Sequence, residues 1–267
     1  MNQAVVGAAL VPGMPHLLAA EPAPSWKLLA DAARQAGQDL RAAEPDVFVV
    51  LSTQWFTVLG HQFQVDPNPR GGHVDENWYA YDYGTLDYDL RVDVELAEAW
   101  ACRAEDMGFQ ARRTRYDGFP VDTGTVVAGK LVDPGRSRPI ALVSCNLYAA
   151  AADLGRIAEA AALAAGELGR RVAFVAVSGF SSGLIQRWIE PAEDRSRTPA
   201  TTPGTAACST CWPPATSRRS WPCASSTPER PRPTASCGRW PFWPAAAPVT
   251  GRPGCSNTGP SGAPGRR

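Results

Sequence analysis

Apolar residues in the first two thirds of the chain alternate between short continuous runs and stretches with helical spacing. The clearest run is Val47–Leu51, in which all five residues are apolar and four are β-branched or aromatic. This composition predicts a strand buried on both faces, as in a parallel sheet covered by helices. The polar residues Ser52, Thr53 and Gln54 come next. We expect them just past the carboxyl end of the strand, where open α/β sheets gather ligands and catalytic groups.

The residues before this run complete a βαβ unit. Ala4–Val11 is apolar and predicts a strand, which ends in a turn-rich loop that carries His16. Apolar residues then recur at helical spacing over residues 26–40, and Pro45 marks the end of that helix. Parallel strands joined in this way open their loops on the same edge of the sheet, so the loops that carry His16 and Gln54 should share an edge.

Strand and helix patterns continue to alternate beyond this unit, and the last strong strand ends in a loop of small residues. This alternation predicts an α/β fold, with a mainly parallel central sheet flanked by helices and an irregular C-terminal tail. Further strands are expected at 109–115, 140–143 and 171–177, and further helices at 93–107, 126–131 and 154–168.

Residues 66–88 interrupt the alternation with a polar, aromatic and turn-rich segment. A segment of this length without periodicity is usually functional, so we expect a lid, a pocket wall or a subunit contact. Acidic residues gather from Asp75 to Asp93, and we interpret them as a solvated face rather than a carboxylate metal site. His73 lies beside them and is expected to face solvent or a partner.

The composition changes at Arg195. The last 73 residues hold ten arginines but one acidic residue, Glu229, together with 14 of the 25 prolines and five of the seven cysteines. No window has a period of two or 3.6, so nothing here predicts a helix stripe or a strand face. We therefore divide the chain into an α/β domain at residues 1–194, truncated at its C-terminal end, and an aberrant tail at residues 195–267.

Two explanations compete for this tail. Disordered basic extensions are poor in tryptophan and cysteine, whereas this tail is rich in both. We favour a frameshift, in which a G+C-rich gene is read in the wrong frame after about codon 195. Cys208 and Cys211 form a CxxC, which is half of a zinc site, but no second pair lies at ligand spacing, so coincidence explains it better.

Charge and composition limit the partners and the compartment. The formal net charge is +0, so no bulk attraction to nucleic acid or to an anionic membrane is expected. No apolar run approaches the ~20 residues that span a bilayer, and Met1–Gln3 lacks the basic start of a signal peptide. Only Cys102 and Cys145 precede the tail, so we expect reduced thiols and a cytoplasmic protein.

Several motifs resemble those of the class III extradiol ring-cleaving dioxygenases. The polar run with its tryptophan at 52–55 and the loop at 116–125 are two of them. The longest are GHVDENWY at residues 72–79, LDYDLR at 86–91 and DVELAE at 93–98. The resemblance covers about residues 4–194. Within the family it is greatest to the α subunits of heteromeric enzymes that open 2-aminophenol.

This resemblance implies an α/β fold and the opening of aromatic rings that bear adjacent hydroxyl or amino groups, with Fe(II) and O₂. In catalytic members two histidines and one glutamate hold the iron, which leaves three sites for the substrate and oxygen. A further histidine acts as acid and base.

Matched to these roles position by position, the chain keeps one of the ligands. His16 stands at the first ligand position, but Gln54 stands at the second, and an amide is a far weaker iron ligand than an imidazole. Ser182 follows a Gly-x-Ser pattern where the family has its acid/base histidine, and the glutamate belongs to the part replaced by the tail. The resemblance thus implies a chain that is not itself catalytic, binds no iron of its own and assembles with a catalytic β subunit of the same family, which acts on a small aromatic substrate.

Two other interpretations stay open. In one, the chain is an active Fe(II)-dependent dioxygenase with a degenerate site, in which His16 and His61 hold the iron with an acid such as Glu76. In the other, it is a metal-free protein that keeps the aromatic pocket as a sensor or scaffold. A hydrogen-bonded structural role is the commoner alternative for a histidine in a strand-end loop such as His16.

Overall fold

The structure is a computed structural model, and it describes residues 4–20, 22, 24–74, 85–116 and 118–179. These residues belong to one compact unit, Met1–Ser209. The predicted tail at residues 195–267 lies outside the described residues, and so does the predicted boundary after residue 194. Ser182 and Glu76 also lie outside them.

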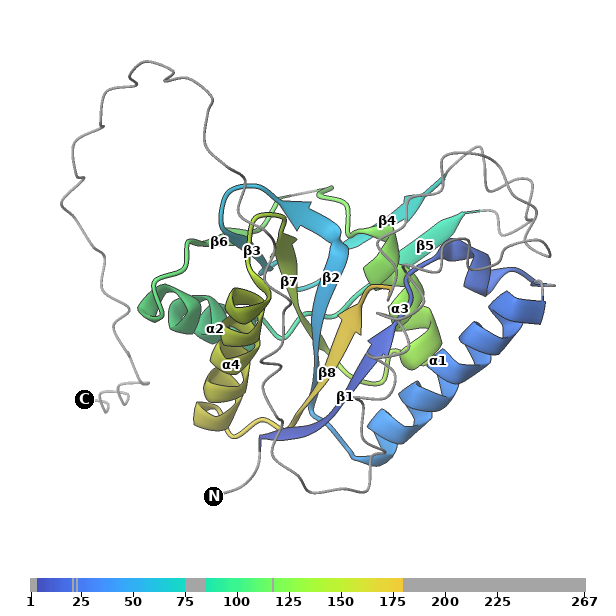
Figure 1. Ribbon diagram of the computed structural model, residues 1–267, viewed down its shortest axis with the longest axis horizontal. Coiled ribbons are helices and arrows are strands. Elements are labelled where there is room, and N and C mark those ends of the chain that lie inside the picture. Colours follow the sequence, from blue (N-terminus) through green and yellow to red (C-terminus); the bar gives the residue numbers. More distant parts are fainter. Residues whose placement is uncertain (1–3, 21, 23, 75–84, 117, 180–267) are drawn as a thin grey trace, which may run out of the picture. The chain divides into compact units, whose positions relative to one another are not determined.

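A six-stranded sheet forms the centre of the unit, in the order β1-β8-β2-β7-β3-β6 (Figure 1). The first four strands of this order run parallel to one another. Strand β3 is antiparallel to β7, and β6 is parallel to β3. The predicted mainly parallel sheet is therefore confirmed. The strands span Val5–Val11 (β1), Val47–Thr57 (β2), His61–Gln64 (β3), Ala111–Thr114 (β6), Ile140–Asn146 (β7) and Val172–Val177 (β8).

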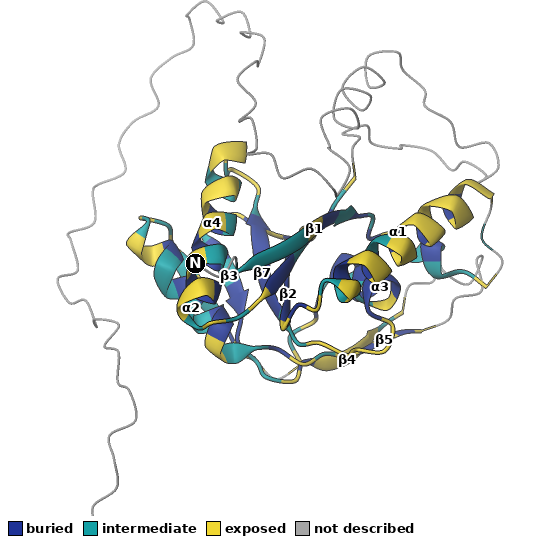
Figure 2. Ribbon diagram, turned by 90° about the horizontal axis from the view of Figure 1, so that it is seen from below, coloured by how far each residue is buried: buried dark blue, intermediate teal, exposed yellow. Residues whose placement is uncertain are grey.

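Helices cover both faces of this sheet, so the core forms two layers (Figure 1). Successive side chains of a strand point to opposite faces. In β2, Phe48 and Val50 therefore join the layer under α1 and α3, while Val47 and Val49 join the layer under α2 and α4. Figure 2 shows the strands buried between helices whose outer faces are exposed. The helices are Pro15–Leu18 (the 3₁₀ helix η1), Pro24–Ala42 (α1), Val94–Asp106 (α2), Thr123–Val132 (α3) and Ala151–Glu167 (α4).

Strand β2 is longer than the sequence pattern predicts. The apolar run ends at Leu51, but the strand continues to Thr57. Its pairing with β7 stops at Ser52 and resumes at Phe56, so residues 53–55 form a bulge. The prediction that the polar run follows the strand is wrong, because these residues lie within it. Pairing with β8 does end at Ser52, so the bulge still lies at the carboxyl edge of the sheet.

Two short strands lie inside the segment at 66–88 that was expected to be irregular. Strands β4 (Arg70–His73) and β5 (Leu86–Asp89) pair antiparallel as a separate ribbon. The sequence of β4 has no apolar alternation, so its conformation follows from pairing with β5, whose Leu86 and Tyr88 are buried. Residues 75–84 between the two strands lie outside the described part of the chain.

Two expectations from composition can be compared with the described residues. None of the helices there has the length and apolar character needed to cross a bilayer. Within the same part of the chain, neither Cys102 nor Cys145 forms a disulfide.

Candidate functional site

The carboxyl edge of the parallel strands brings several polar segments together. The backbone N–H of Ser178, just after β8, donates to the carbonyl of Val11 at the end of β1 over 3.1 Å. The hydroxyl of Thr53, in the β2 bulge, donates to the carbonyl of Val177 over 3.1 Å. These bonds tie the ends of three strands to one another. The expectation that the loops after β1 and β2 open on one edge is confirmed.

Asp122 joins this edge to the start of α3. As the N-cap residue it accepts hydrogen bonds from the backbone N–H of Thr125 over 2.9 Å and from the hydroxyl of Thr125 over 2.7 Å. It also accepts from the hydroxyl of Ser52, which is fully buried, over 2.6 Å. The carboxylate therefore fastens α3 to β2. Its place at the start of a predicted helix was the signal for this role, but the motifs alone did not single it out.

Gln54 is held by the loop after β1 and by the start of α3. Its side-chain Nε2 donates to the carbonyl of Gly13 over 2.9 Å, and its backbone N–H donates to the hydroxyl of Ser52 over 3.2 Å. A Cβ on Gly124 would lie 2.7 Å from Gln54 Cδ, and a Cβ on Gly13 would lie 3.0 Å from Nε2. Gly13 must be a glycine, because a Cβ there would also lie 2.6 Å from the backbone Cα of Gly124, whereas a Cβ on Gly124 would displace the Gln54 side chain.

His16 lies in η1, on the side of the sheet that α1 and α3 cover. Its ring packs edge-on against Trp26 of α1, with 4.4 Å between the ring centroids. Burial lowers the pKa of the His16 imidazole, because the charged form is poorly solvated there. The residue is thus neutral at neutral pH and packs as part of the α1/α3 layer.

His61 lies on the opposite face of the sheet. It is 2% exposed and shares a strand face with Phe63, which belongs to the α2/α4 layer. Its ring packs edge-on against Phe109, and its Nδ1 lies 3.2 Å from the carbonyl oxygen of Ser144. Burial lowers the pKa of His61, and the hydrogen bond to Ser144 opposes this in part. The sheet therefore separates His61 from His16, and the structure does not bring the two together.

The described residues do not fit the three-donor iron site of the resembled family. No group of three or more His, Cys, Asp or Glu side chains in that part of the chain is arranged to hold a metal ion. The position expected for the first ligand holds the imidazole of His16, and the one expected for the second holds the amide of Gln54, whose oxygen is a weaker iron ligand than an imidazole. The position expected for the glutamate lies in the tail, outside the described residues. No reaction step is therefore assigned to iron on this chain.

His73 fixes the β4–β5 ribbon to the loop before α3. Its Nε2 donates to the carbonyl of Val121, and its ring stacks on Tyr88 with 5.5 Å between centroids. The hydroxyl of Tyr88 in turn accepts the backbone N–H of Val121 over 3.3 Å. His73 was expected to face solvent or a partner, and these contacts leave it partly buried within the unit.

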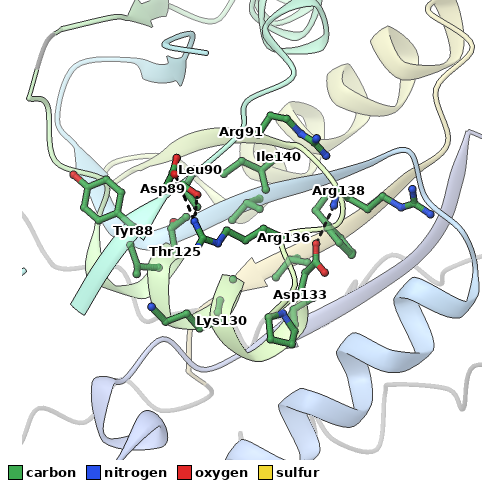
Figure 3. A pocket seen from close by; sticks show the side chains of 18 of the residues that line it. Tyr88, Asp89, Leu90, Arg91, Thr125, Lys130, Asp133, Arg136, Arg138 and Ile140 are labelled. Carbon is green, nitrogen blue, oxygen red and sulfur yellow. Dashed lines mark hydrogen bonds and ion pairs between the residues drawn. The ribbon is translucent and has the colours of Figure 1, made fainter. Parts of the chain in front are cut away.

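The structure also contains a cavity of about 510 Å³, lined in part by the motif at residues 86–91 (Figure 3). It lies between α3, β5 and the loop at residues 134–138, beside the first residues of β2 and β7. None of His16, Ser52 or Gln54 lines it. Asn68, Asp87 and Tyr88 belong to the segment at 66–88, for which a pocket wall was one of the expectations, while the other walls come from segments far apart in the sequence.

The family model described as the catalytic LigB subunit of aromatic ring-opening dioxygenase matches residues 7–191. The chain belongs to this family. The resemblance inferred from the motifs is thereby confirmed, and the matched range contains His16, Gln54 and the bulge of β2. Dioxygenases of the LigB family use Fe(II) in the catalytic subunit.

Curated relatives of this LigB-family chain include both subunits of one enzyme. The chain is 41% identical over 196 residues to the 2-aminophenol 1,6-dioxygenase alpha subunit of Pseudomonas sp, which covers 72% of this chain and 70% of that protein. It is 28% identical over 156 residues to the beta subunit from Pseudomonas sp, covering 54% of this chain and 50% of that protein. The chain therefore spans half the length of the second relative and more than two thirds of the first.

Among solved structures, the chain is similar to the uncharacterized protein JW3007 from Escherichia coli K12. The TM-score is 0.45 at 16% identity, and the match covers 66% of this chain and 61% of that chain. A likeness of this size carries no functional argument.

Proposed function

We propose that this chain is an α-type, non-catalytic subunit of a heteromeric extradiol dioxygenase that opens 2-aminophenol or a related catechol. Its role is to bind and stabilise a catalytic β-type subunit, which holds the Fe(II). The identity of 41% to an α subunit, against 28% to a β subunit, supports this assignment. We place the assembly in the cytoplasm, because Cys102 and Cys145 form no disulfide in the described part of the chain.

The observation that carries the proposal is the state of Gln54. This residue stands where the family has its second histidine ligand, and its amide is instead a hydrogen-bonded part of the fold. Gly13 and Gly124 pack against it, and a Cβ on Gly13 would also lie 2.6 Å from the Cα of Gly124. An amide can bind a metal only through its oxygen, which is a far weaker ligand for iron than an imidazole nitrogen. The place of a ligand is thus taken by a group that stabilises the strand edge.

An exposed apolar surface at the same edge supports a role in assembly. The β2–β3 turn and the loop between β7 and α4 are joined where the backbone N–H of Leu147 donates to the carbonyl of Thr57 over 2.9 Å. Surfaces of this kind mark sites of protein–protein contact. We propose that this surface, the apolar edge, contacts the catalytic β-type subunit. Its five side chains are each more than half exposed: Phe56, Val58, Leu59, Leu147 and Tyr148.

The first test is to purify the full chain alone and together with a β-type subunit, under anaerobic conditions. We expect the chain alone to hold no stoichiometric iron and to show no O₂ uptake on 2-aminophenol. Uptake should appear when the β-type subunit is added, and should exceed that of the β-type subunit alone. Near-stoichiometric iron with ring cleavage by this chain alone would overturn the proposal.

The second test places a charge on the apolar edge. Leu59→Glu should weaken association with the β-type subunit at least about tenfold, because a carboxylate is left without a partner in an apolar interface. Leu28→Glu is the matched control, since Leu28 is 72% exposed on α1 and Leu59 is 61% exposed. Equal association of the two variants, measured by analytical ultracentrifugation, would refute this surface as the contact.

The structure or the experiments above distinguish the two other interpretations, an active dioxygenase with a degenerate site and a metal-free aromatic-binding protein, from the proposed subunit role. An active dioxygenase that uses His16 and His61 would need both on one metal, whereas they lie on opposite faces of the sheet. A metal-free aromatic-binding protein would bind 2-aminophenol without a partner and would not co-purify with a β-type subunit.

A further inference from the structure

The cavity beside α3 has an apolar floor and a charged rim. The floor is formed by side chains of the sheet and of α3 that are less than a tenth exposed: Phe48, Val50, Val126, Val132 and Val175. The rim is formed by β5, by the C-terminal turn of α3 and by the loop that follows it. Its volume of about 510 Å³ lies within the range of sites that bind small molecules.

One positive charge on the rim is left over after the ion pairs are counted. Arg136 reaches across the cavity to Asp89, where it donates to the backbone carbonyl over 2.9 Å and lies 3.8 Å from the carboxylate (Figure 3). Arg70 shares the same carboxylate at 3.1 Å. Lys130 and Asp87 also line the cavity, and within the described part of the chain neither side chain has a hydrogen-bond or ion-pair partner. Of the charged residues that line the cavity, four are cations and three are carboxylates: Arg91, Lys130, Arg136 and Arg138 against Asp87, Asp89 and Asp133.

Two of the remaining charged side chains of the lining, those of Asp133 and Arg91, hold the loop that follows α3. Asp133 accepts hydrogen bonds from the hydroxyl of Ser137 and from the backbone N–H of Arg138. The guanidinium of Arg91 donates to the carbonyl of Ser137 over 3.1 Å. These bonds hold the loop at 134–138 as the wall of the cavity, so its shape does not depend on a bound molecule.

We propose that this cavity is a binding site for a small monoanion with an aromatic or unsaturated carbon body. The body would lie on the apolar floor, and the anionic group would face Arg136 and Lys130. A neutral compound would leave the extra charge uncompensated, and a dianion would be repelled by Asp87 and Asp89. The site is distinct from the carboxyl edge that holds Gln54, so it is a second site and goes beyond the function proposed above.

Gly129 provides a way to fill the cavity without disturbing the fold. It lines the cavity within α3, and a Cβ there would meet no atom within 4 Å. Gly129→Leu should therefore project into the empty space and should not lower the melting temperature, since leucine favours a helix more than glycine does. Gly155→Leu is the matched control, because Gly155 lies in α4 on the other face of the sheet with equally open space.

The experiment measures binding of 2-naphthoate and of neutral 2-naphthamide to the full chain by isothermal titration calorimetry. We expect 2-naphthoate to bind more tightly than 2-naphthamide. Gly129→Leu should weaken the binding of 2-naphthoate at least about tenfold, while Gly155→Leu should leave it unchanged. Lys130→Gln should weaken 2-naphthoate about two- to fivefold, the size expected for an exposed ion pair. Lys27→Gln, on α1, is its control.

Three results would each overturn the site. Equal affinities of the Gly129→Leu and Gly155→Leu variants would place binding elsewhere. A lower melting temperature of Gly129→Leu than of Gly155→Leu would show that the space is filled by protein. Equal binding of the acid and the amide would refute the preference for an anion. No β-type subunit and no catalytic activity enters these measurements, so their outcome is independent of the proposed subunit role.

Discussion

The two core layers of this protein are built on different principles. In the α2/α4 layer, small side chains let the helices pack closely, and Ala101, Ala104, Ala160 and Ala164 are all 0% exposed. The α1/α3 layer instead contains the Ser52–Asp122 bond, the fixed amide of Gln54 and the cavity. The first layer is therefore packed mainly through small apolar side chains, although it also buries the imidazole of His61, while the second contains the polar contacts at the strand edge and the cavity. Candidate chemistry is found in the second.

The largest expected effect comes from breaking the tightly packed layer. Trp100→Ala should lower the free energy of unfolding by about 3–5 kcal/mol, because it removes a 1%-exposed indole, its edge-on contact with Phe63 and its hydrogen bond to the carbonyl of Ile157. Trp55→Ala, in the other layer, should cost less, since that side chain is 8% exposed in the bulge. Urea denaturation checks both, and an equal or larger loss for Trp55→Ala would contradict the contrast between the layers.

A smaller effect is expected at the polar contact of the other layer. Gln54→Glu keeps the shape of the side chain but replaces the group that donates to Gly13 with a carboxylate oxygen, which faces a carbonyl. Because Gln54 is exposed and water can reach the carboxylate, the free energy of unfolding should fall by about 0.5–1.5 kcal/mol. Gln110→Glu is the control, because Gln110 is exposed and makes no side-chain hydrogen bond within the described residues. If both variants unfold at the same urea concentration, Gln54 has no structural role.

The smallest effect is a pH dependence that comes from His61. Burial lowers its pKa below the value of 6.5, so between the two values the unfolded chain binds more protons than the folded one. Stability is therefore full above about pH 6.5 and falls as the pH drops toward the lowered pKa. His61→Gln should reduce the difference between the urea midpoints at pH 8 and pH 5. His16, whose pKa is lowered in the same direction, should account for part of the dependence that remains.

The order of elements could be predicted because apolar periodicity is a local property. The run at Val47–Leu51 and the helical spacing around Trp26 each report burial of a single element, and both are found where expected. The bulge in β2 could not be predicted, because polar residues within a strand look like a loop when their partners are unknown. Strand β4 could not be predicted from its own sequence for the same reason, since its conformation depends on pairing with β5.

In the candidate site, too, some features could be predicted from the sequence and others could not. That His16 and Gln54 share an edge follows from the parallel order of the strands, which the pattern predicts. That His61 lies on the opposite face does not follow from its distance of seven residues from Gln54, because the bulge and the turn between them change which face each side chain meets. The hydrogen bond from Gln54 to Gly13 joins residues 41 positions apart, and no local pattern encodes it.

The position of β8 between β1 and β2 has a consequence for biosynthesis. Strand β1 is the first to leave the ribosome, yet its partner β8 ends at Val177. At ordinary translation rates the two are separated by on the order of ten to thirty seconds. In that interval β1 has no partner among the described strands, and its unpaired backbone is a target for chaperones or for misfolding. Among the described strands, the one made last joins the two made first, so a chain that ends before residue 177 cannot complete the pairing of β8 with β1 and β2.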